Sequence, residues 1–401
     1  MKIPLIYRFY LYKISESVLF SFSISAFFFQ SRGIDLSGLL ILESMYSCAI
    51  VLMELPTGLL SDILGKKKSL HIANILRLAS HIGFILSSNF YIFLIFHFIY
   101  GMCVSFFSGS YSALLHDFVE SSNAQKTQTE RENIYYQYEG TSNMLCLLSI
   151  VGSSFLGAYV SSFDPCYPYI LNAFFSIVSL VSLSMLNLKS DFNIETRSTR
   201  QFISNSYTSL RRSPELISIL LFAAYFFFIF RVQFFLSQNF LMQIKFNSFQ
   251  AGSIISISMI FAAVASKMAW TLEKKIGPSL LLAVIAILFT LPALILGITQ
   301  SQFGIISIFI LFIGRGLYLP TLRKMVLFSC DADKKATFLS VMNLGGYFLF
   351  SVLSPLAGSL NDLHGSQFSF LILFGFGFLG ILFILRSFLR LKKIGIQAEE
   401  T

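Results

Sequence analysis

The chain has 401 residues, of which 55% are hydrophobic, 16% are aromatic and only 12% are charged. Soluble domains carry about 25% charged residues, so this sequence has half of the usual charged complement. Together with 46 phenylalanines, the composition excludes soluble, fibrous and disordered proteins and indicates an integral membrane protein. The formal net charge of +9 then reflects membrane topology and contact with anionic lipids, and nucleic acid is not expected as a partner.

Residues that could support metal binding or catalysis are scattered along the sequence. The five cysteines form no CxxC pair and have no histidine at ligand spacing. No histidine lies at catalytic spacing from a carboxylate, and there is no G-x-S-x-G motif. We therefore expect no metal, no cofactor and no catalytic residue, and we do not expect an enzyme.

Twelve apolar segments are long enough for a membrane-spanning helix, which needs about 20 residues. A polar stretch separates six of them from the other six, which predicts a duplicated six-helix unit. No A-x-A-like cleavage site follows the first segment, so we expect a retained helix there rather than a signal peptide. The segments cover roughly 14–31, 37–60, 69–88, 90–115, 136–160, 167–188, 215–238, 248–270, 279–299, 303–326, 337–360 and 366–388.

The predicted fold is all-α and integral to the membrane, with twelve transmembrane helices in two six-helix bundles. Its parts are an N-terminal bundle over 1–188, a cytoplasmic central loop over 189–214, a C-terminal bundle over 215–389 and a cytoplasmic tail over 390–401.

The distribution of basic residues predicts the orientation. Of the 29 Lys and Arg residues, 24 fall in the tails and turns on one side of the twelve segments, and two fall on the other side. The side rich in Lys and Arg is normally cytoplasmic. Both termini are therefore predicted to be cytoplasmic. The remaining three basic residues lie within spans and are Arg77, Arg231 and Arg315.

The turn between the second and third segments reads ELPTGLLSDILGKKK over 54–68. It resembles the cytoplasmic signature G-x-L-[AS]-D-x-x-G-[RK]-[RK] of the major facilitator superfamily, although Ile63 stands where the family usually has arginine. The resemblance implies a gating role for this turn, in which the glycines allow close helix approach and a tight turn and the aspartate forms a charge latch. The gating residues would be Gly58, Asp62, Gly65, Lys66 and Lys67.

Four further strings are similar to the bacterial, drug-efflux-like branch of this family. They are SGSYSALLHD (108–117), YYQYEG (135–140), GRGLYLP (314–320) and KATFLSV (335–341). The resemblance implies a multi-pass protein of the bacterial cytoplasmic (inner) membrane, which works as a monomer. The fifth segment departs from the antiporter motif because it lacks proline, and it keeps only a ladder of small residues suited to close helix packing: Ser149, Ser153, Gly157 and Ser161.

Two acidic residues of the second segment are candidates for coupling or substrate binding, because ionisable groups inside a membrane cost about 2.5–3.5 kcal/mol or more each. Glu43 and Glu54 are 11 residues apart, which places them on one helix face about 16 Å apart. Glu43 is interpreted as a coupling or substrate-cation site, as a structural partner of Arg231, or as a residue of the outer vestibule. Glu54 is interpreted as a coupling residue or as part of a gate or helix cap.

Four other polar residues inside predicted spans are candidates. His97 stands where the family has arginine, and imidazole titrates near pH 6.5, although a packing role is the alternative. Arg315 has a guanidinium that can hold an anionic substrate group or pair with a carboxylate. Arg231 has the same two interpretations, and Gln238 can supply hydrogen bonds to a bound molecule.

The function implied by the resemblance is secondary active transport by alternating access, with small-molecule substrates. No phosphate-binding loop is present, so the expected energy source is an ion gradient, with protons as the coupling ion. Efflux of a drug-like, peptide-like or otherwise toxic molecule leads, and the three arginines within spans favour an acidic or zwitterionic substrate. The alternatives are import of a metabolite, favoured by the missing proline, and a non-transporting receptor or scaffold, which would be expected to carry extra domains or long tails.

Overall fold

The computed structural model describes the backbone of residues 4–186, 214–330 and 334–399, and most side chains within 4–186, 216–330 and 334–382. All regular secondary structure in these ranges is helical. The predicted central loop over 189–214 lies outside the described residues except for Pro214, with which a helix begins.

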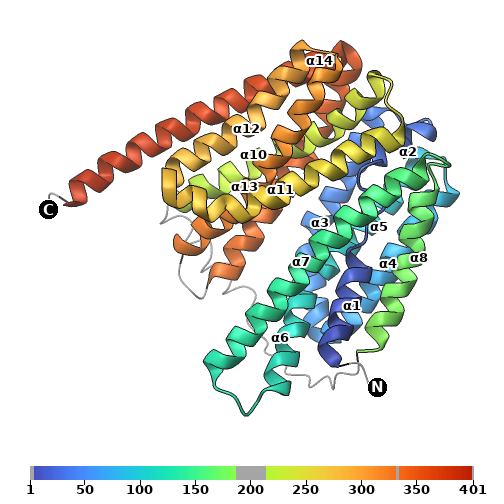
Figure 1. Ribbon diagram of the computed structural model, residues 1–401, viewed down its shortest axis with the longest axis vertical. Coiled ribbons are helices and arrows are strands. Elements are labelled where there is room, and N and C mark those ends of the chain that lie inside the picture. Colours follow the sequence, from blue (N-terminus) through green and yellow to red (C-terminus); the bar gives the residue numbers. More distant parts are fainter. Residues whose placement is uncertain (1–3, 187–213, 331–333, 400–401) are drawn as a thin grey trace. The chain divides into compact units, whose positions relative to one another are not determined.

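The helices follow one another with short connections (Figure 1). In the first half they are α1 (Leu5–Ser17), α2 (Ser25–Ser31), α3 (Leu36–Leu64), α4 (Lys66–Leu86), α5 (Phe90–Phe107), α6 (Ser110–Ser122), α7 (Gln128–Ser161) and α8 (Tyr167–Ser184). In the second half they are α10 (Pro214–Gln243), α11 (Ser248–Ile276), α12 (Pro278–Ile298), a short 3-10 helix η1 (Gln302–Gly304), α13 (Ile305–Phe328) and α14 (Lys335–Glu399).

The chain forms two compact units. Unit 1 comprises Met1–Asp35, Leu42–Glu195 and Asn247–Ser256, and unit 2 comprises Leu36–Ile41, Thr196–Phe246 and Ile257–Thr401. The start of α3 therefore belongs to unit 2, and the start of α11 belongs to unit 1.

Ten helical stretches of the described chain are long and apolar enough to cross a membrane. One of them counts twice, because α14 contains two helices that meet at Gly365, where φ is 83°. Eleven of the twelve predicted spans are thereby found as helices. The remaining one is the first predicted segment, over 14–31.

The prediction of one continuous helix over 14–31 is wrong. Helix α1 begins nine residues earlier, at Leu5, and ends at Ser17; residues 18–24 are non-helical, and α2 then runs for only 7 residues. Lys13, which the prediction placed in the N-terminal tail, lies inside α1. Serine, aromatic and β-branched residues dominate 18–24, and all of these have modest helix propensity.

Side chains of α7 and α8 replace the hydrogen bonds that the interruption removes. The amide of Leu19 donates to Ser153 Oγ at 2.9 Å, and the amide of Phe20 donates to Asn172 Oδ1 at 2.8 Å. Both acceptors are buried. Irregular backbone is tolerated at membrane depth only where such partners exist, so α7 and α8 are what permit the interruption.

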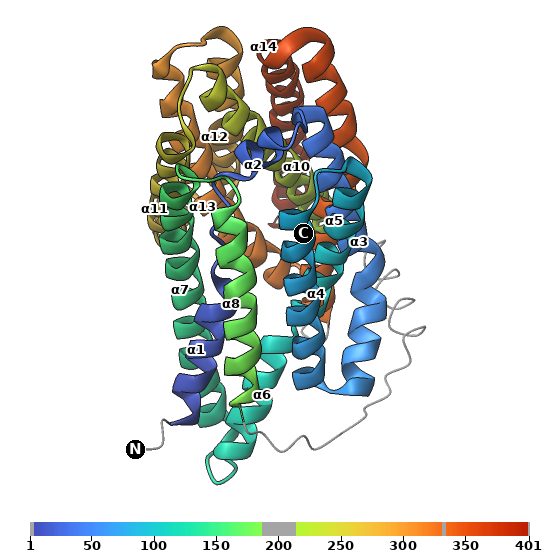
Figure 2. The same cartoon turned by 90° about the vertical axis from the view of Figure 1, so that its right-hand side faces the viewer.

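Helix α1 packs against α7 and α8, and the three lie side by side in both ribbon views (Figures 1 and 2). The predicted small-residue ladder of α7 makes the closest approach. A Cβ atom added to Gly157 would lie 1.8 Å from the carbonyl oxygen of Phe20, which is too close for any side chain. In unit 2, α10 packs against α12, α13 and α14.

The contact at Gly157 predicts a position-specific cost. Gly157→Ala is expected to lower the melting temperature of the detergent-purified protein, because relieving the overlap with Phe20 costs about 1–3 kcal/mol. Gly152→Ala is the matched control, since a Cβ atom on that glycine of the same helix meets nothing within 4 Å. Equal melting temperatures for the two variants would contradict this account of the packing.

Candidate functional site

The predicted gating residues lie where α3 turns into α4. Gly65 forms the turn between the two helices with φ 90°, a value that favours glycine. Asp62 is exposed and forms an ion pair with Lys66, whose Nζ is 2.8 Å from Asp62 Oδ1. Lys67 donates to the carbonyl oxygen of Leu186, just beyond the end of α8, at 2.6 Å. Gly58, two turns earlier, has open space around the position of its missing Cβ within the described chain.

Glu54 and Glu43 lie on α3, in the part of it that belongs to unit 1. Ser108, at the junction of α5 and α6, donates to Glu54 Oε1 at 3.1 Å. Glu43 is partly buried, and its carboxylate lies close enough to the His97 ring of α5 for the two to interact electrostatically. Unit 1 therefore brings two of the predicted coupling candidates together.

His97 itself is 3% exposed. Its Nδ1 lies 2.8 Å from the carbonyl oxygen of Phe93, and its ring packs against Phe84 and Phe29 at centroid distances of 4.8 and 5.2 Å. His97 is thus a packing residue, and it also has the carboxylate of Glu43 nearby, as a coupling role would require.

Three predicted candidates belong to unit 2. Arg231 of α10 faces the rings of Phe350 and Tyr347, with its guanidinium carbon 4.8 and 5.5 Å from the centroids. Gln238 is fully buried on the same helix. Arg315, near the middle of α13, is partly buried and lies over aromatic rings.

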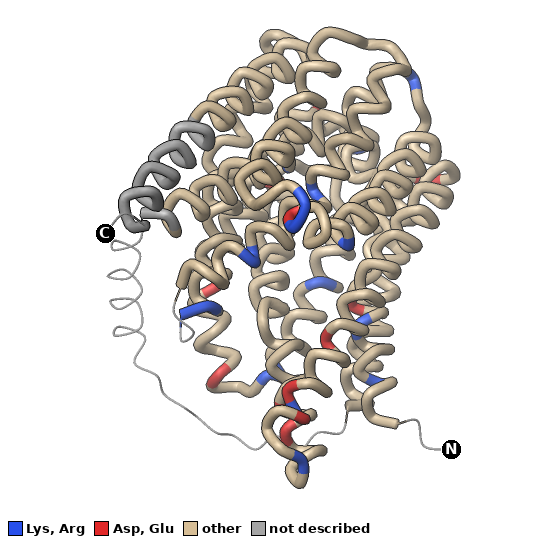
Figure 3. The backbone as a smooth tube through the Cα atoms, turned by 60° about the vertical axis from the view of Figure 1, so that its left-hand side comes forward, with Lys and Arg blue, Asp and Glu red and all other residues tan. Residues whose placement is uncertain are grey.

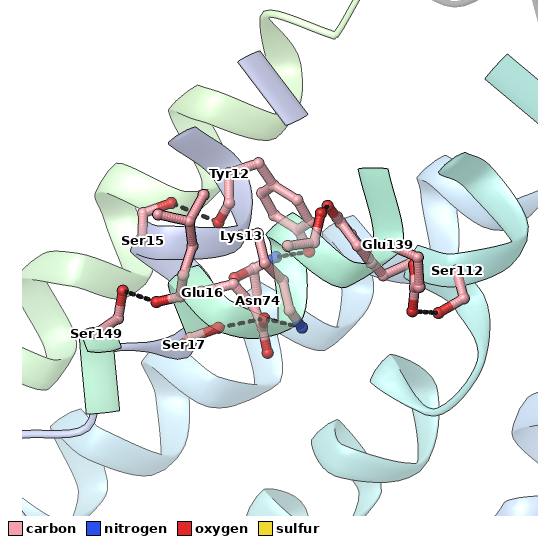
Figure 4. Close-up of polar contacts among 12 residues, drawn as sticks. Tyr12, Lys13, Ser15, Glu16, Ser17, Asn74, Ser112, Glu139 and Ser149 are labelled. Carbon is pink, nitrogen blue, oxygen red and sulfur yellow. Dashed lines mark hydrogen bonds and ion pairs between the residues drawn. The ribbon is translucent and has the colours of Figure 1, made fainter. Parts of the chain in front are cut away.

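Charged side chains are sparse along the helices, as the long tan stretches of Figure 3 show. A buried ion pair with several hydrogen bonds lies at the end of α1, and the sequence analysis did not select its residues. Lys13 Nζ is 3.0 Å from Glu16 Oε2, and the two side chains are only 17% and 16% exposed. Ser17 also donates to Glu16 Oε2, at 3.3 Å, so Glu16 lies between Ser17 and Lys13 (Figure 4).

Arg77 of α4 completes this charge cluster, which consists of Lys13, Glu16 and Arg77. Its Nη1 donates to the backbone carbonyl oxygen of Glu16, and its Nε donates to Ser176 Oγ of α8 at 3.0 Å. A cation at the carboxyl end of α1 is favoured by the helix dipole. The guanidinium therefore stabilises the end of α1 where the backbone leaves the helix.

Tyrosine and asparagine side chains surround the cluster. Asn74 of α4 donates to the hydroxyl of Tyr12 at 3.3 Å, and Lys13 Nζ lies 4.8 Å from the ring centre of Tyr111. A second carboxylate, Glu139 of α7, accepts a hydrogen bond from Ser112 at 2.8 Å (Figure 4).

The charge cluster can exchange a proton. It holds two cations and one carboxylate, so it carries a net charge of +1 while Glu16 is ionised. Protonation of Glu16 would abolish the ion pair and release Lys13. The same excess of positive charge also allows the cluster to attract an anion.

A signal for this cluster was present in the sequence. Lys13 and Glu16 are three residues apart, the spacing of an ion pair on one helix face. Serines then occupy every second position from 15 to 25 except 19, a spacing that does not match a helix. Starting the first segment at residue 14 hid both features, because it left Lys13 outside the helix.

The ion pair predicts non-additive stability. Lys13→Met or Glu16→Gln alone leaves a buried charge without its partner, a change that costs about 3–5 kcal/mol where burial is complete. The double variant removes both charges and keeps Arg77, which binds the backbone of Glu16, so its melting temperature should exceed those of both single variants.

The more exposed pair between Lys66 and Asp62, whose side chains are 32% and 62% exposed, is the control, because exposed pairs contribute about 1 kcal/mol or less. Additive losses at Lys13 and Glu16, or equal effects at the two pairs, would contradict the expected coupling.

Solved transporter structures share this fold. The nucleoside transporter NupG superimposes with a TM-score of 0.81 at 12% identity, covering 96% of this chain and 99% of its own. The peptide transporter POT in complex with sulfate gives a TM-score of 0.74 at 14% identity, covering 96% and 94%. A bacterial homolog of the human lysosomal transporter Spinster gives 0.72 at 14% identity, covering 96% of each chain.

Identities this low show the fold alone. Among curated protein sequences, none matches this chain. The family model described as "Major Facilitator Superfamily" matches residues 12–355, a stretch that runs from α1 into α14 and includes the turn with Asp62 and Lys66. The chain therefore belongs to the Major Facilitator Superfamily of membrane transporters.

Proposed function

We propose that the protein is a proton-coupled secondary transporter, which exports a small toxic molecule from the bacterial cytoplasm by alternating access. The observation that carries proton coupling is the buried pair of Lys13 and Glu16 beside Arg77. An ionisable group inside the membrane is costly to keep. A carboxylate that is paired with a lysine one helical turn away can change that partnership by taking up one proton.

The same site explains how a proton could alter the protein's conformation. Glu16 immediately precedes the interruption at 18–24, so its charge acts where α1 ends. Protonation weakens the hold of Glu16 on Lys13, and Arg77 keeps the carbonyl of Glu16 in place. In unit 1, Glu43 beside His97 is a second candidate pair for proton coupling. The turn with Gly58, Asp62, Gly65, Lys66 and Lys67 forms the cytoplasmic gate.

Export is supported by the resemblance of four sequence strings to drug-efflux proteins. Import is the second candidate, and two observations favour it: α7 lacks the proline of the antiporter motif, and the structures of similar fold include a nucleoside transporter and a peptide transporter. A receptor or scaffold without transport is the third reading of the same fold.

Growth assays in a bacterium that lacks its main efflux pumps test direction and coupling together. The wild-type protein is expected to protect cells from some members of a panel of toxic compounds. Glu16→Gln, which mimics a permanently protonated residue, should remove protection at equal membrane levels, and Glu43→Gln tests the second pair. Glu132→Gln, which changes an exposed acidic residue of α7, should protect like the wild type.

The outcomes separate the candidates. Increased sensitivity to toxic nucleoside or peptide analogues would replace export with import. Absence of any effect on either panel would contradict both. For a compound that is exported, its addition to energised inverted vesicles should release protons with the wild type. Glu16→Gln should lose this release but still exchange labelled for unlabelled compound, which shows that it is folded.

The proposed organisation follows from the distribution of charge. A monomer has six-helix bundles over 1–188 and 215–389, with the central loop 189–214, the tail 390–401 and both termini in the cytoplasm. The support is the ratio of Lys and Arg on the two sides, although Lys13 now belongs to α1 rather than to the tail.

Fusions test this orientation in the inner membrane. Alkaline phosphatase joined after Gly33 is expected to be active, because the enzyme folds only outside the cytoplasm, and the same fusion after Lys126 should be inactive. Green fluorescent protein at the C-terminus should fluoresce. Activity at Lys126 without activity at Gly33 would reverse the proposed topology.

A further inference from the structure

The packing of α13 fixes the direction of Arg315. A Cβ atom on Gly316 would lie 2.1 Å from the carbonyl oxygen of Ala262 in α11, and one on Gly314 would lie 3.0 Å from Cβ of Leu288 in α12. Consecutive helical residues are about 100° apart, so these two contacts flank Arg315 on either side. The arginine therefore points between α11 and α12, toward α10.

Aromatic rings are the contacts of this guanidinium. Its carbon atom lies 5.4 Å from the ring centre of Phe230 in α10 and 5.7 Å from that of Tyr318, one turn further along α13. Within the described part of the chain, no carboxylate, carbonyl or hydroxyl oxygen accepts a hydrogen bond from Arg315. Ring faces attract the cation but leave its five N–H donors unfilled.

Two other arginines, Arg77 inside α4 and Arg32 in the turn after α2, do have oxygen acceptors. Arg77 of unit 1 binds a carbonyl oxygen and a serine hydroxyl, and Arg32 binds Ser88 and the carbonyl oxygen of Ile85 at 3.0 Å each. A partly buried cation without acceptors is costly. The nitrogen atoms of Arg315 have no acceptor among the described residues and are not fully buried, so they are open to a ligand.

The surrounding sequence supplies no carboxylate for it. Between residues 216 and 330 the only acidic residue is Glu273, and its carboxylate is paired with Lys324 at 2.7 Å. Two further cations, Arg323 and Arg231, lie close enough to repel Arg315 electrostatically. This part of unit 2 therefore has an excess of positive charge among its apolar helices.

We propose that Arg315, with Phe230 and Tyr318 beside it, binds the oxyanion of the transported molecule, which is an organic anion with a carboxylate or phosphate next to a flat apolar body. This proposal rests on the proposed transport function and names its substrate class. The fork of a guanidinium matches the two oxygens of a carboxylate or phosphate, and the bond is strengthened by the charge on both partners.

The flat apolar body is inferred from the rings around the arginine. Phe230 packs against Phe289 and Phe312 at centroid distances of 6.0 and 5.8 Å. Tyr318 packs against Phe289 at 5.7 Å, and its hydroxyl donates to the carbonyl oxygen of Ala223 at 2.5 Å. These contacts hold the two rings beside Arg315 in fixed positions, which suits a rigid, planar ligand.

Equilibrium binding of three matched probes to the purified protein tests the proposal. The probes are 1-naphthoate, 1-naphthyl phosphate and the neutral 1-naphthamide. Wild type is expected to bind at least one anion about ten-fold or more tightly than the amide, which corresponds to about 1.4 kcal/mol. Arg315→Gln should remove this preference, and Arg315→Lys, which keeps the charge but not the fork, should retain part of it.

Lys267→Gln is the control, because Lys267 is an exposed cation of α11 in the same unit. The proposal is overturned if the wild type shows no preference for either anion, if Arg315→Gln keeps the preference, or if Lys267→Gln removes it as well. The anion that shows the larger preference identifies the headgroup as carboxylate or phosphate.

Stability without ligand gives an independent readout. Arg315→Met removes a cation that has no acceptor, so the melting temperature of the ligand-free protein is expected to stay level or rise. A fall as large as that of Lys13→Met would mean that Arg315 serves a structural partner, and it would overturn the proposal. Because binding is measured without a gradient, failure of proton coupling at Glu16 leaves this result intact.

Discussion

Inside a membrane there is no water to hydrogen-bond the backbone, and the rest of this structure depends on that constraint. The first apolar segment breaks its helix at 18–24, so its amides need other acceptors. Ser153 and Asn172 provide them, and Arg77 binds the last carbonyl before the break. The charge cluster around Glu16 exists at this place because the helix ends there. The proposed coupling site therefore lies directly beside the interruption.

The two units handle their buried cations in different ways. In unit 1, Lys13 and Arg77 each bond to oxygen atoms of the protein as well as lying over a ring, which suits the proposed proton coupling. In unit 2, Arg315 meets aromatic faces, which suits the proposed binding of an anion. The two proposals thus assign proton coupling to one unit and anion recognition to the other.

Sequence reasoning predicted the helical spans well, because a run of about 20 apolar residues has few alternatives. It also placed the turn at Gly65, since a glycine before lysines is a local signal, and it selected Arg315 because a charge in an apolar run is one as well. It missed the contacts around the break after α1. Arg77 binds the carbonyl of Glu16, and Ser153 and Asn172 accept from the two amides at 19 and 20, but these three residues lie 61 to 156 positions beyond Glu16, and one sequence does not reveal such contacts.

The interruption at 18–24 also determines whether the first segment can turn as one rigid helix. A continuous helix turns as one rod, because each residue is bonded to the one four positions away. Here the amides of Phe22 and Ile24 bond only three residues back, within tight turns. Helix α1 packs against α7 and α8. Because the helical hydrogen bonding stops at the break, α1 and α2 need not turn together.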